Sequence, residues 1–355
     1  MAIDFTSALY LGLRHPSEAL APWAALSTGR PAVLGEPAEA TALAGELAAL
    51  QGVEGAMLMP STWHLFWDLI GFLQRRQPVD CLVDDRAYPI LQWAAGAAAQ
   101  RFPHQDRLAL QKLAQASRRR GRTPLIVADG YSVSTNRPMP LCDYAEIAVA
   151  NHGWLIVDDT QALGVLGSAP SVSAPLGTDG GGALRWHGLR GAPLLIGASL
   201  AKAFGAPLAV LGGPAMILEP FRHASLVRLH CSPPSAAAIT AARRGLAIAQ
   251  QLGGSLRRRL VQLVTRLRQR LAAAGLRPIG TLPFPVQSFT TASVAATLAA
   301  HRQLLRRGVQ TVLTAAGQGG PPRLTFIVTA AHRRSDVDRV GRAFGDARLL
   351  SGALS

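Results

Sequence analysis

Short apolar runs alternate with amphipathic segments through the first two thirds of the chain. Buried strands are expected at 55–59, 80–84, 124–129, 154–158, 193–198 and 207–211. Helices with one apolar face are expected at 61–75, 88–99, 108–120 and 141–151. This alternation of strands and helices predicts a mostly parallel sheet with helices on both faces.

The pattern changes after residue 232. Pro233, Pro234 and Ser235 are typical of a helix start, and helical spacing continues to about Ala274. Further strands are expected near 285–290, 309–313 and 323–329, and further helices near 292–307 and 335–345. We therefore expect an α/β fold with three parts. These are an N-terminal arm at 1–35, a large domain at 36–245 and a small C-terminal α+β domain at 246–355.

Composition favours a folded protein of the cytoplasm. Of 355 residues, 49% are hydrophobic and 16% are charged, which allows a large core. The cysteines Cys81, Cys142 and Cys231 are odd in number and scattered, so neither a disulfide framework nor a zinc site is expected. The chain begins without the pattern of a signal peptide and has no apolar run of about 18 residues. We expect no membrane association.

The net charge of +15 comes almost entirely from arginine, because Lys112 and Lys202 are the only lysines. Such a bias is typical of a GC-rich genome. It is also compatible with a basic surface for an anionic partner such as coenzyme A or an acyl carrier protein. The arginine clusters lack the interleaved aromatic residues that stack on bases, so nucleic-acid binding is not expected.

Two segments have the features of a chemical site. The apolar strand at 154–158 ends in Asp158 and Asp159, and a turn with Gly164 and Gly167 follows. Ligands of open parallel sheets bind at the carboxyl ends of strands, where a carboxylate can hold a cationic ligand. Lys202 lies among small and apolar residues directly after another strand. A desolvated lysine has a lowered pKa and can form a Schiff base with an aldehyde, whereas Lys112 belongs to a polar helix.

The chain resembles the α-oxoamine synthase family of fold-type I pyridoxal-phosphate-dependent enzymes over nearly its whole length. The family has Asp-Asp/Glu-Ala-His and Gly-Val-Leu-Gly where this chain has 158–167, and Thr/Ser-x-x-Lys where it has Ser199 to Lys202. Residues 10–13, 182–189, 232–234 and 323–332 also resemble the family. The resemblance implies a large domain with a mostly parallel sheet and a small C-terminal domain.

The same resemblance implies roles for individual residues. Lys202 would hold pyridoxal 5'-phosphate through a Schiff base, and Asp158 would keep the pyridine nitrogen protonated. Ser199 would contact the phosphate. Tyr88 would stack on the ring where the family has His. Ser61, Thr62 and Trp63 fall where the family's phosphate-binding turn begins a helix. The resemblance also implies a homodimer, and no metal ion is expected.

The chain departs from the family at several positions. Gln161 replaces a His, Ala8 an Asn and Val133 a Ser, although Ser132 and Ser134 flank Val133. Thr325 stands where the family's Arg holds the amino-acid carboxylate. Arg323, two residues earlier on the same strand, would point to the same face. Either Arg323 takes over that contact, or the substrate carries no carboxylate in that place.

The first functional hypothesis is a decarboxylative C-acyltransferase. It would condense an amino acid with an acyl thioester of coenzyme A or an acyl carrier protein to give an α-amino ketone. Alternatives are an aminotransferase or another pyridoxal-phosphate enzyme with altered carboxylate recognition, and a degenerate non-catalytic subunit. Ser199-x-x-Lys202 also matches penicillin-binding enzymes, but a third lysine for their Lys-Thr-Gly element is missing from the sequence. A metal pair at Asp158 and Asp159 has no third acidic group nearby in the sequence.

Overall fold

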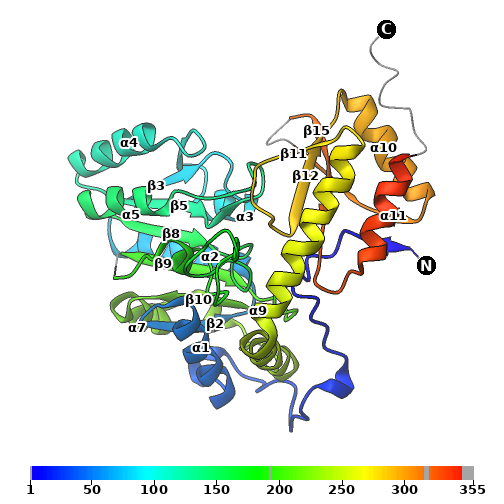
Figure 1. Ribbon diagram of the computed structural model, residues 1–355. Helices are drawn as coiled ribbons and strands as arrows, with labels where there is room; N and C mark the ends of the chain where they lie inside the picture. The colour runs from blue at the N-terminus through cyan, green and yellow to red at the C-terminus, as the bar shows by residue number, and fades with distance from the viewer. Residues whose placement is uncertain (1, 192, 316–319, 346–355) are drawn as a thin grey trace.

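A large sheet forms the centre of the first two thirds of the chain (Figure 1). The computed structural model describes residues 2–191, 193–315 and 320–345. In this sheet the strands run in the order β2 (Gly55–Met59), β10 (Ala209–Gly213), β9 (Leu194–Ser199), β8 (Trp154–Asp158), β5 (Thr123–Asp129), β3 (Val79–Asp84) and β4 (Gln100–Phe102). Neighbours pair in parallel, except that β10 is antiparallel to both β9 and β2. The expected mostly parallel α/β sheet is confirmed.

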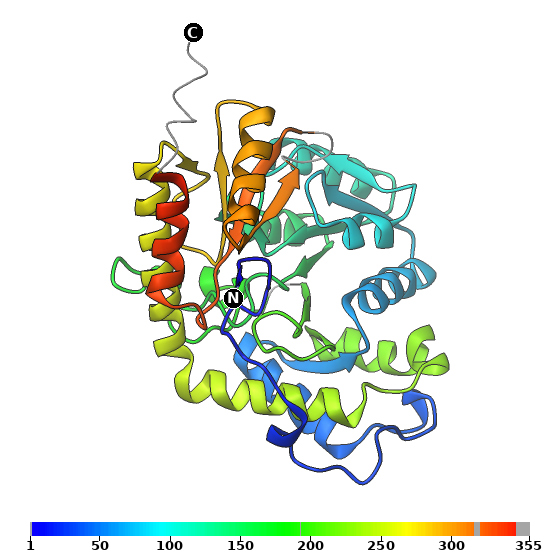
Figure 2. The same ribbon diagram turned by 90° about the vertical axis from the view of Figure 1, so that its right-hand side faces the viewer.

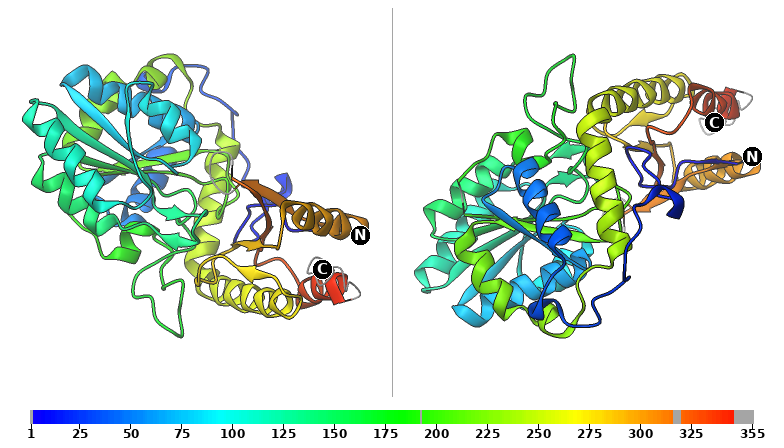
Figure 3. Two further views of the ribbon diagram at one scale, coloured as in Figure 1. Left: turned by 90° about the horizontal axis from the view of Figure 1, so that it is seen from above. Right: turned by 90° about the horizontal axis from the view of Figure 1, so that it is seen from below.

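Helices cover both faces of this sheet (Figure 3). Alternate residues of each strand enter two separate apolar clusters, so that Leu155 and Val157 of β8 face one layer and Ile156 faces the other. The helices are α1 (Ala38–Gln51), α2 (Thr62–Arg76), α3 (Pro89–Ala95), α4 (Arg107–Arg119), α5 (Leu141–Ala150), α6 (Ala183–His187), α7 (Ala215–Ala224) and α8 (Leu226–His230). Two-sided burial explains why the strands are continuously apolar.

The long helix α9 (Ala236–Ala273) connects the large sheet to a smaller α+β unit (Figure 1). Ser235 caps its start by accepting a hydrogen bond from the Ala238 N–H at 3.3 Å. The small sheet has the order β11 (Arg277–Pro278), β12 (Val286–Thr290), β15 (Pro322–Ile327) and β14 (Val312–Ala315). Helices α10 (Val294–Arg306) and α11 (Arg334–Gly345) complete it, and α11 lies beside the second half of α9 (Figure 2). The expected boundary near residue 246 falls inside α9.

Two expectations about single elements were wrong, and one helix was not predicted. The helix expected at 88–99 ends at Ala95, because Gly96 adopts a positive φ of 80°, and the edge strand β4 follows. The strand expected at 309–313 is two strands. Val309 and Gln310 (β13) pair with β1 (Ile3–Asp4) of the N-terminal arm, whereas β14 pairs with β15. Helix α1 was not predicted, since its Ala-rich sequence has no clear apolar stripe.

Candidate active site

A cavity of about 600 Å³ lies at the carboxyl ends of β5 and β8, between the large sheet and the small domain. Seven of the residues predicted from the sequence line it: Thr62, Tyr88, Asp158, Gln161, Ser199, Lys202 and Arg323. The predicted residues Ser61 and Trp63 are not among its lining residues. This position agrees with the rule that open α/β sheets bind ligands outside the carboxyl ends of their strands.

Lys202 lies in the turn after β9, and its Nζ is 6.0 Å from the centroid of the Tyr88 ring. Burial lowers the pKa of the Lys202 ammonium group, while the carboxylates of Asp158 and Asp129 act in the opposite direction. A lysine with a lowered pKa is more readily present as the free amine, which is the form that attacks an aldehyde.

Asp158 and Asp129 end two adjacent strands and are paired residues in the register of β8 and β5. Burial raises the pKa of Asp158, and burial together with the Asp158 charge raises the pKa of Asp129 well above its ordinary value. Asp158 accepts a hydrogen bond from the Thr160 N–H at 2.9 Å, and Asp129 accepts from the Tyr88 N–H at 3.0 Å. Two carboxylates beside one lysine fit a ligand that brings a further positive charge, such as a protonated pyridine ring.

Asp159 faces away from this cavity. It is fully buried, and its carboxylate accepts from the Ala183 N–H at 3.0 Å, at the start of α6. Burial raises the pKa of Asp159 well above its ordinary value. The two neighbouring acids therefore have different surroundings, and only Asp158 of the pair lines the cavity.

The start of α2 offers backbone donors beside the cavity. The Ser61 hydroxyl caps this helix by accepting from the His64 N–H at 3.4 Å, and it also contacts His64 Nδ1 at 2.9 Å. The backbone N–H groups of Thr62 and Trp63 have no hydrogen-bond partner within the described part of the chain. Unpaired N–H groups at a helix start suit an anion such as a phosphate. The Trp63 side chain instead packs edge-on against Trp93, with ring centroids 5.9 Å apart.

Gln161 is held by the N-terminal arm. The hydroxyl of Tyr10 donates a hydrogen bond to Gln161 Oε1, so the amide NH₂ group is the end that stays available to the cavity. Tyr10 is buried, and its ring packs edge-on against Phe284 of the small domain at 5.9 Å. The arm thus takes part in the site, which sequence reasoning did not anticipate.

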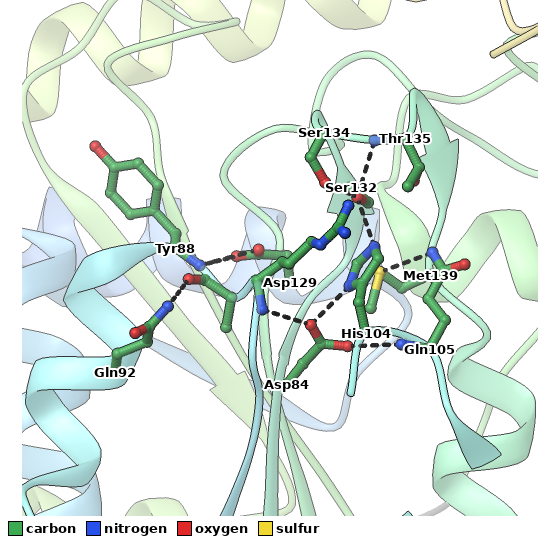
Figure 4. Close-up of polar contacts among 12 residues, drawn as sticks. Asp84, Tyr88, Gln92, His104, Gln105, Asp129, Ser132, Ser134, Thr135 and Met139 are labelled. Carbon is green, nitrogen blue, oxygen red and sulfur yellow. Dashed lines mark hydrogen bonds and ion pairs between the residues drawn. The ribbon is translucent and has the colours of Figure 1, made fainter. Parts of the chain in front are cut away.

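A hydrogen-bonded chain of three side chains stands behind one wall of the cavity (Figure 4). His104 contacts Asp84 through Nδ1 at 2.7 Å and Ser132 through Nε2 at 3.0 Å. The His104 interaction lowers the pKa of Asp84, although burial acts against it. Sequence reasoning missed Asp84, His104 and Asp129. Asp84 and Asp129 both had a local signal, because each ends an apolar strand as Asp158 does.

The small domain supplies the opposite wall. Arg323 lines the cavity and donates from Nη1 to the carbonyl oxygen of Ser134 at 2.7 Å. Thr325 is buried, and its hydroxyl lies 2.8 Å from Ser288 Oγ and 2.7 Å from Thr314 Oγ1. The position that holds Arg in the resembled family is therefore part of a group of uncharged hydroxyls in this chain.

Comparisons with known proteins agree with this architecture. The family model "Aminotransferase class I and II" matches residues 86–344. An 8-amino-7-oxononanoate synthase of Methylococcus capsulatus is 30% identical, with 97% of this chain and 89% of that protein covered. The enzyme of the same name from Halorhodospira halophila is 31% identical, with 95% and 84% covered.

Solved structures show the same fold. The serine palmitoyltransferase of Sphingomonas wittichii superposes with a TM-score of 0.82 at 16% identity, covering 97% of this chain and 86% of that one. The 8-amino-7-oxononanoate synthase of Francisella tularensis gives a TM-score of 0.73 at 17% identity, covering 97% and 96%. Fold and site define the class of fold-type I pyridoxal-phosphate-dependent transferases. The chain belongs to the aminotransferase class I and II family and is similar to its α-oxoamine synthases.

Proposed function

We propose that this protein is a pyridoxal-phosphate-dependent C-acyltransferase that joins an amino acid to an acyl thioester. The observation that supports it best is one partly buried lysine beside two paired strand-end carboxylates in a cavity. The chain is also similar to 8-amino-7-oxononanoate synthases over almost its full length. In the overall reaction a C–C bond forms between Cα and the thioester carbonyl carbon. The C–S bond breaks to release the thiol, and the amino-acid carboxyl group leaves as carbon dioxide.

Each side chain has a part in this proposal. Lys202 would hold the cofactor through its Nζ and, when free, would move the proton of the substrate Cα. Asp158 would accept a hydrogen bond from the pyridine nitrogen, and Tyr88 would stack on the ring. Ser199 and the N–H groups that begin α2 would hold the phosphate, and the Gln161 amide would donate to the ring oxygen. Bound pyridoxal phosphate supplies the electron sink for the developing Cα charge.

The acyl carrier, the oligomeric state and the location belong to the same proposal. Coenzyme A or an acyl carrier protein would deliver the thioester to this strongly basic chain of net charge +15. A homodimer is supported by Trp63 and Trp93, which are 40% and 65% exposed beside the cavity and would be covered by a second copy. A cytoplasmic location agrees with three free cysteines. Within the described residues, no helix is long and apolar enough to cross a membrane.

The experiment is a three-product assay. Purified protein loaded with pyridoxal phosphate is incubated with an amino acid and an acyl-coenzyme A, and free thiol, carbon dioxide and amino ketone are measured together. The proposal expects equal amounts of all three. Amino transfer to a 2-oxo acid without thiol release would identify an aminotransferase instead. Cofactor binding without any reaction on a panel of amino acids and thioesters would favour a non-catalytic subunit.

A further inference from the structure

Two arginines from different domains line the cavity that contains Lys202. Arg86 lies just after the carboxyl end of β3 in the large sheet, and Arg323 lies on β15 of the small domain. Together with Lys202 they are the cationic residues in the described lining of this cavity. Burial lowers the pKa of the Arg323 guanidinium, and the nearby charge of Arg86 lowers it further.

Neither guanidinium group is neutralised by an acid. Within residues 2–191, 193–315 and 320–345, neither arginine forms an ion pair, whereas buried Arg228 contacts Glu36 and Arg266 contacts Asp338 at 2.8 Å. Asp85 lines the same cavity, yet its buried Oδ1 has no hydrogen-bond partner and it pairs with neither arginine. Among the described residues, the Arg323 guanidinium has one hydrogen bond, which it donates to the Ser134 carbonyl oxygen at 2.7 Å. Two neighbouring arginines that line a cavity and form no ion pair with a described acid indicate a site for an anion.

We propose that Arg86 and Arg323 together form a carboxylate-binding clamp that spans the two domains. This inference rests on the proposed function and specifies how that site recognises its substrate. The planar fork of a guanidinium matches a carboxylate with two parallel hydrogen bonds, and the anion would relieve the repulsion between the two arginines. The hydroxyls around Thr325 make uncharged contacts at the position left by the missing arginine. The carboxylate would belong either to the amino acid or to the far end of the acyl chain.

The test uses Arg86→Gln, Arg323→Gln and the double variant, all loaded with pyridoxal phosphate. Arg101→Gln is the matched control, since Arg101 is an exposed arginine on β4 that does not line the cavity. Calorimetric titrations compare glycine, L-alanine and L-serine with their amides. Kinetics compare acyl-coenzyme A donors with and without a terminal carboxylate.

If the clamp holds the amino acid, each single variant weakens amino-acid binding by roughly tenfold to a hundredfold, the expected effect of losing a charged hydrogen bond, and leaves amide binding unchanged. If it holds the acyl chain, only the KM for carboxylate-ended donors rises. Wild-type binding of every carboxylate compound by both single variants and the double variant would overturn the clamp, even if condensation proceeds. Arginine-dependent carboxylate binding without condensation would leave the clamp standing and overturn the proposed function.

Discussion

Asp129 and Asp158 stand side by side as register partners at the ends of β5 and β8. Burial raises the pKa of both carboxyl groups, and the charge of Asp158 raises the pKa of Asp129 further. Two buried, ionised carboxylates side by side destabilise the folded protein. A bound cation close to both of them offsets that repulsion. The cofactor site is therefore expected to be destabilising until pyridoxal phosphate binds.

The first prediction is that Asp129→Asn stabilises the cofactor-free protein at neutral pH. The folded-state pKa of Asp129 is raised above the ordinary value of 3.8, so the folded protein becomes less stable as pH rises from that value through the raised pKa. Asparagine keeps an oxygen for the Tyr88 N–H but carries no charge. We expect a gain of about 1–2 kcal/mol in the free energy of unfolding at pH 7.

Urea unfolding at pH 7 and at pH 3.5 measures this gain. At pH 3.5 the acid is mostly protonated in both states, so most of the advantage of the variant should be lost. Glu46→Gln on the exposed face of α1 is the control for the removal of one negative charge. A gain of equal size at both pH values would show that charge at Asp129 is not its cause.

The second prediction concerns the two lysines of the chain. Reduction of the cofactor-loaded protein with borohydride should attach pyridoxal phosphate to the peptide that contains Lys202, because this partly buried lysine has a lowered pKa. Lys202→Ala should lose the adduct and the visible absorption of bound cofactor. Lys112→Ala, on the exposed part of α4, should retain both. Labelling that maps to Lys112 would contradict the assignment.

The third prediction separates the two adjacent acids. Asp158→Asn should lower kcat by at least about tenfold, because an amide cannot hold a ring proton as a carboxylate does. Asp159→Asn should chiefly change stability, since Asp159 contacts the Ala183 N–H and not the cavity. Steady-state kinetics and thermal melts on both variants give the two readouts. If Asp159→Asn lowers kcat and Asp158→Asn changes only stability, the roles of the two acids are the opposite of those assigned to them.

The fourth prediction is a homodimer in solution. Sedimentation equilibrium should give twice the chain mass of 37.4 kDa at micromolar concentration. Trp63→Ser and Trp93→Ser should weaken association, because these two exposed rings lie beside the cavity. Trp23→Ser is the control, because Trp23 is an exposed tryptophan in the N-terminal arm. A fully active monomer would exclude the dimer as a requirement for the site.

Sequence reasoning found the parts of the site that have a local signal. Lys202 and Asp158 each follow an apolar strand directly, and that context is visible within a few residues. Asp129 has the same context, yet its partnership with Asp158 depends on the strand order of the sheet. The contact of His104 with Ser132 joins two residues 28 positions apart, and no periodic pattern encodes such a contact.

At the start of α2, local bonding sets the direction of three adjacent side chains. Ser61 and Trp63 flank Thr62, but among these three only Thr62 lines the cavity. The Ser61 hydroxyl caps α2, and the helical geometry turns the Trp63 ring toward Trp93. At this turn a phosphate would be bound by the backbone N–H groups of Thr62 and Trp63, and such binding does not depend on side-chain identity.

The last prediction follows from the bond between Tyr10 and Gln161. Because the Tyr10 hydroxyl donates to Gln161 Oε1, it orients the amide so that its NH₂ group serves the cavity. Tyr10→Phe removes the donor and keeps the ring packed on Phe284. Loss of one neutral hydrogen bond corresponds to about 0.5–1.5 kcal/mol, so the Kd for pyridoxal phosphate should rise by roughly threefold to tenfold. Gln161→Ala should raise it at least as much.

A double-mutant cycle decides whether Tyr10 acts through Gln161. If it does, Tyr10→Phe should add almost nothing to the effect of Gln161→Ala, because the oriented group is already absent. Tyr144→Phe is the control: this buried tyrosine contacts Asp84 at 3.3 Å and does not line the cavity, so its effect should be independent of Gln161. Cofactor affinity from fluorescence titration supplies all the values. Additive losses for Tyr10→Phe and Gln161→Ala would mean that the N-terminal arm stabilises the fold without setting the direction of the Gln161 amide.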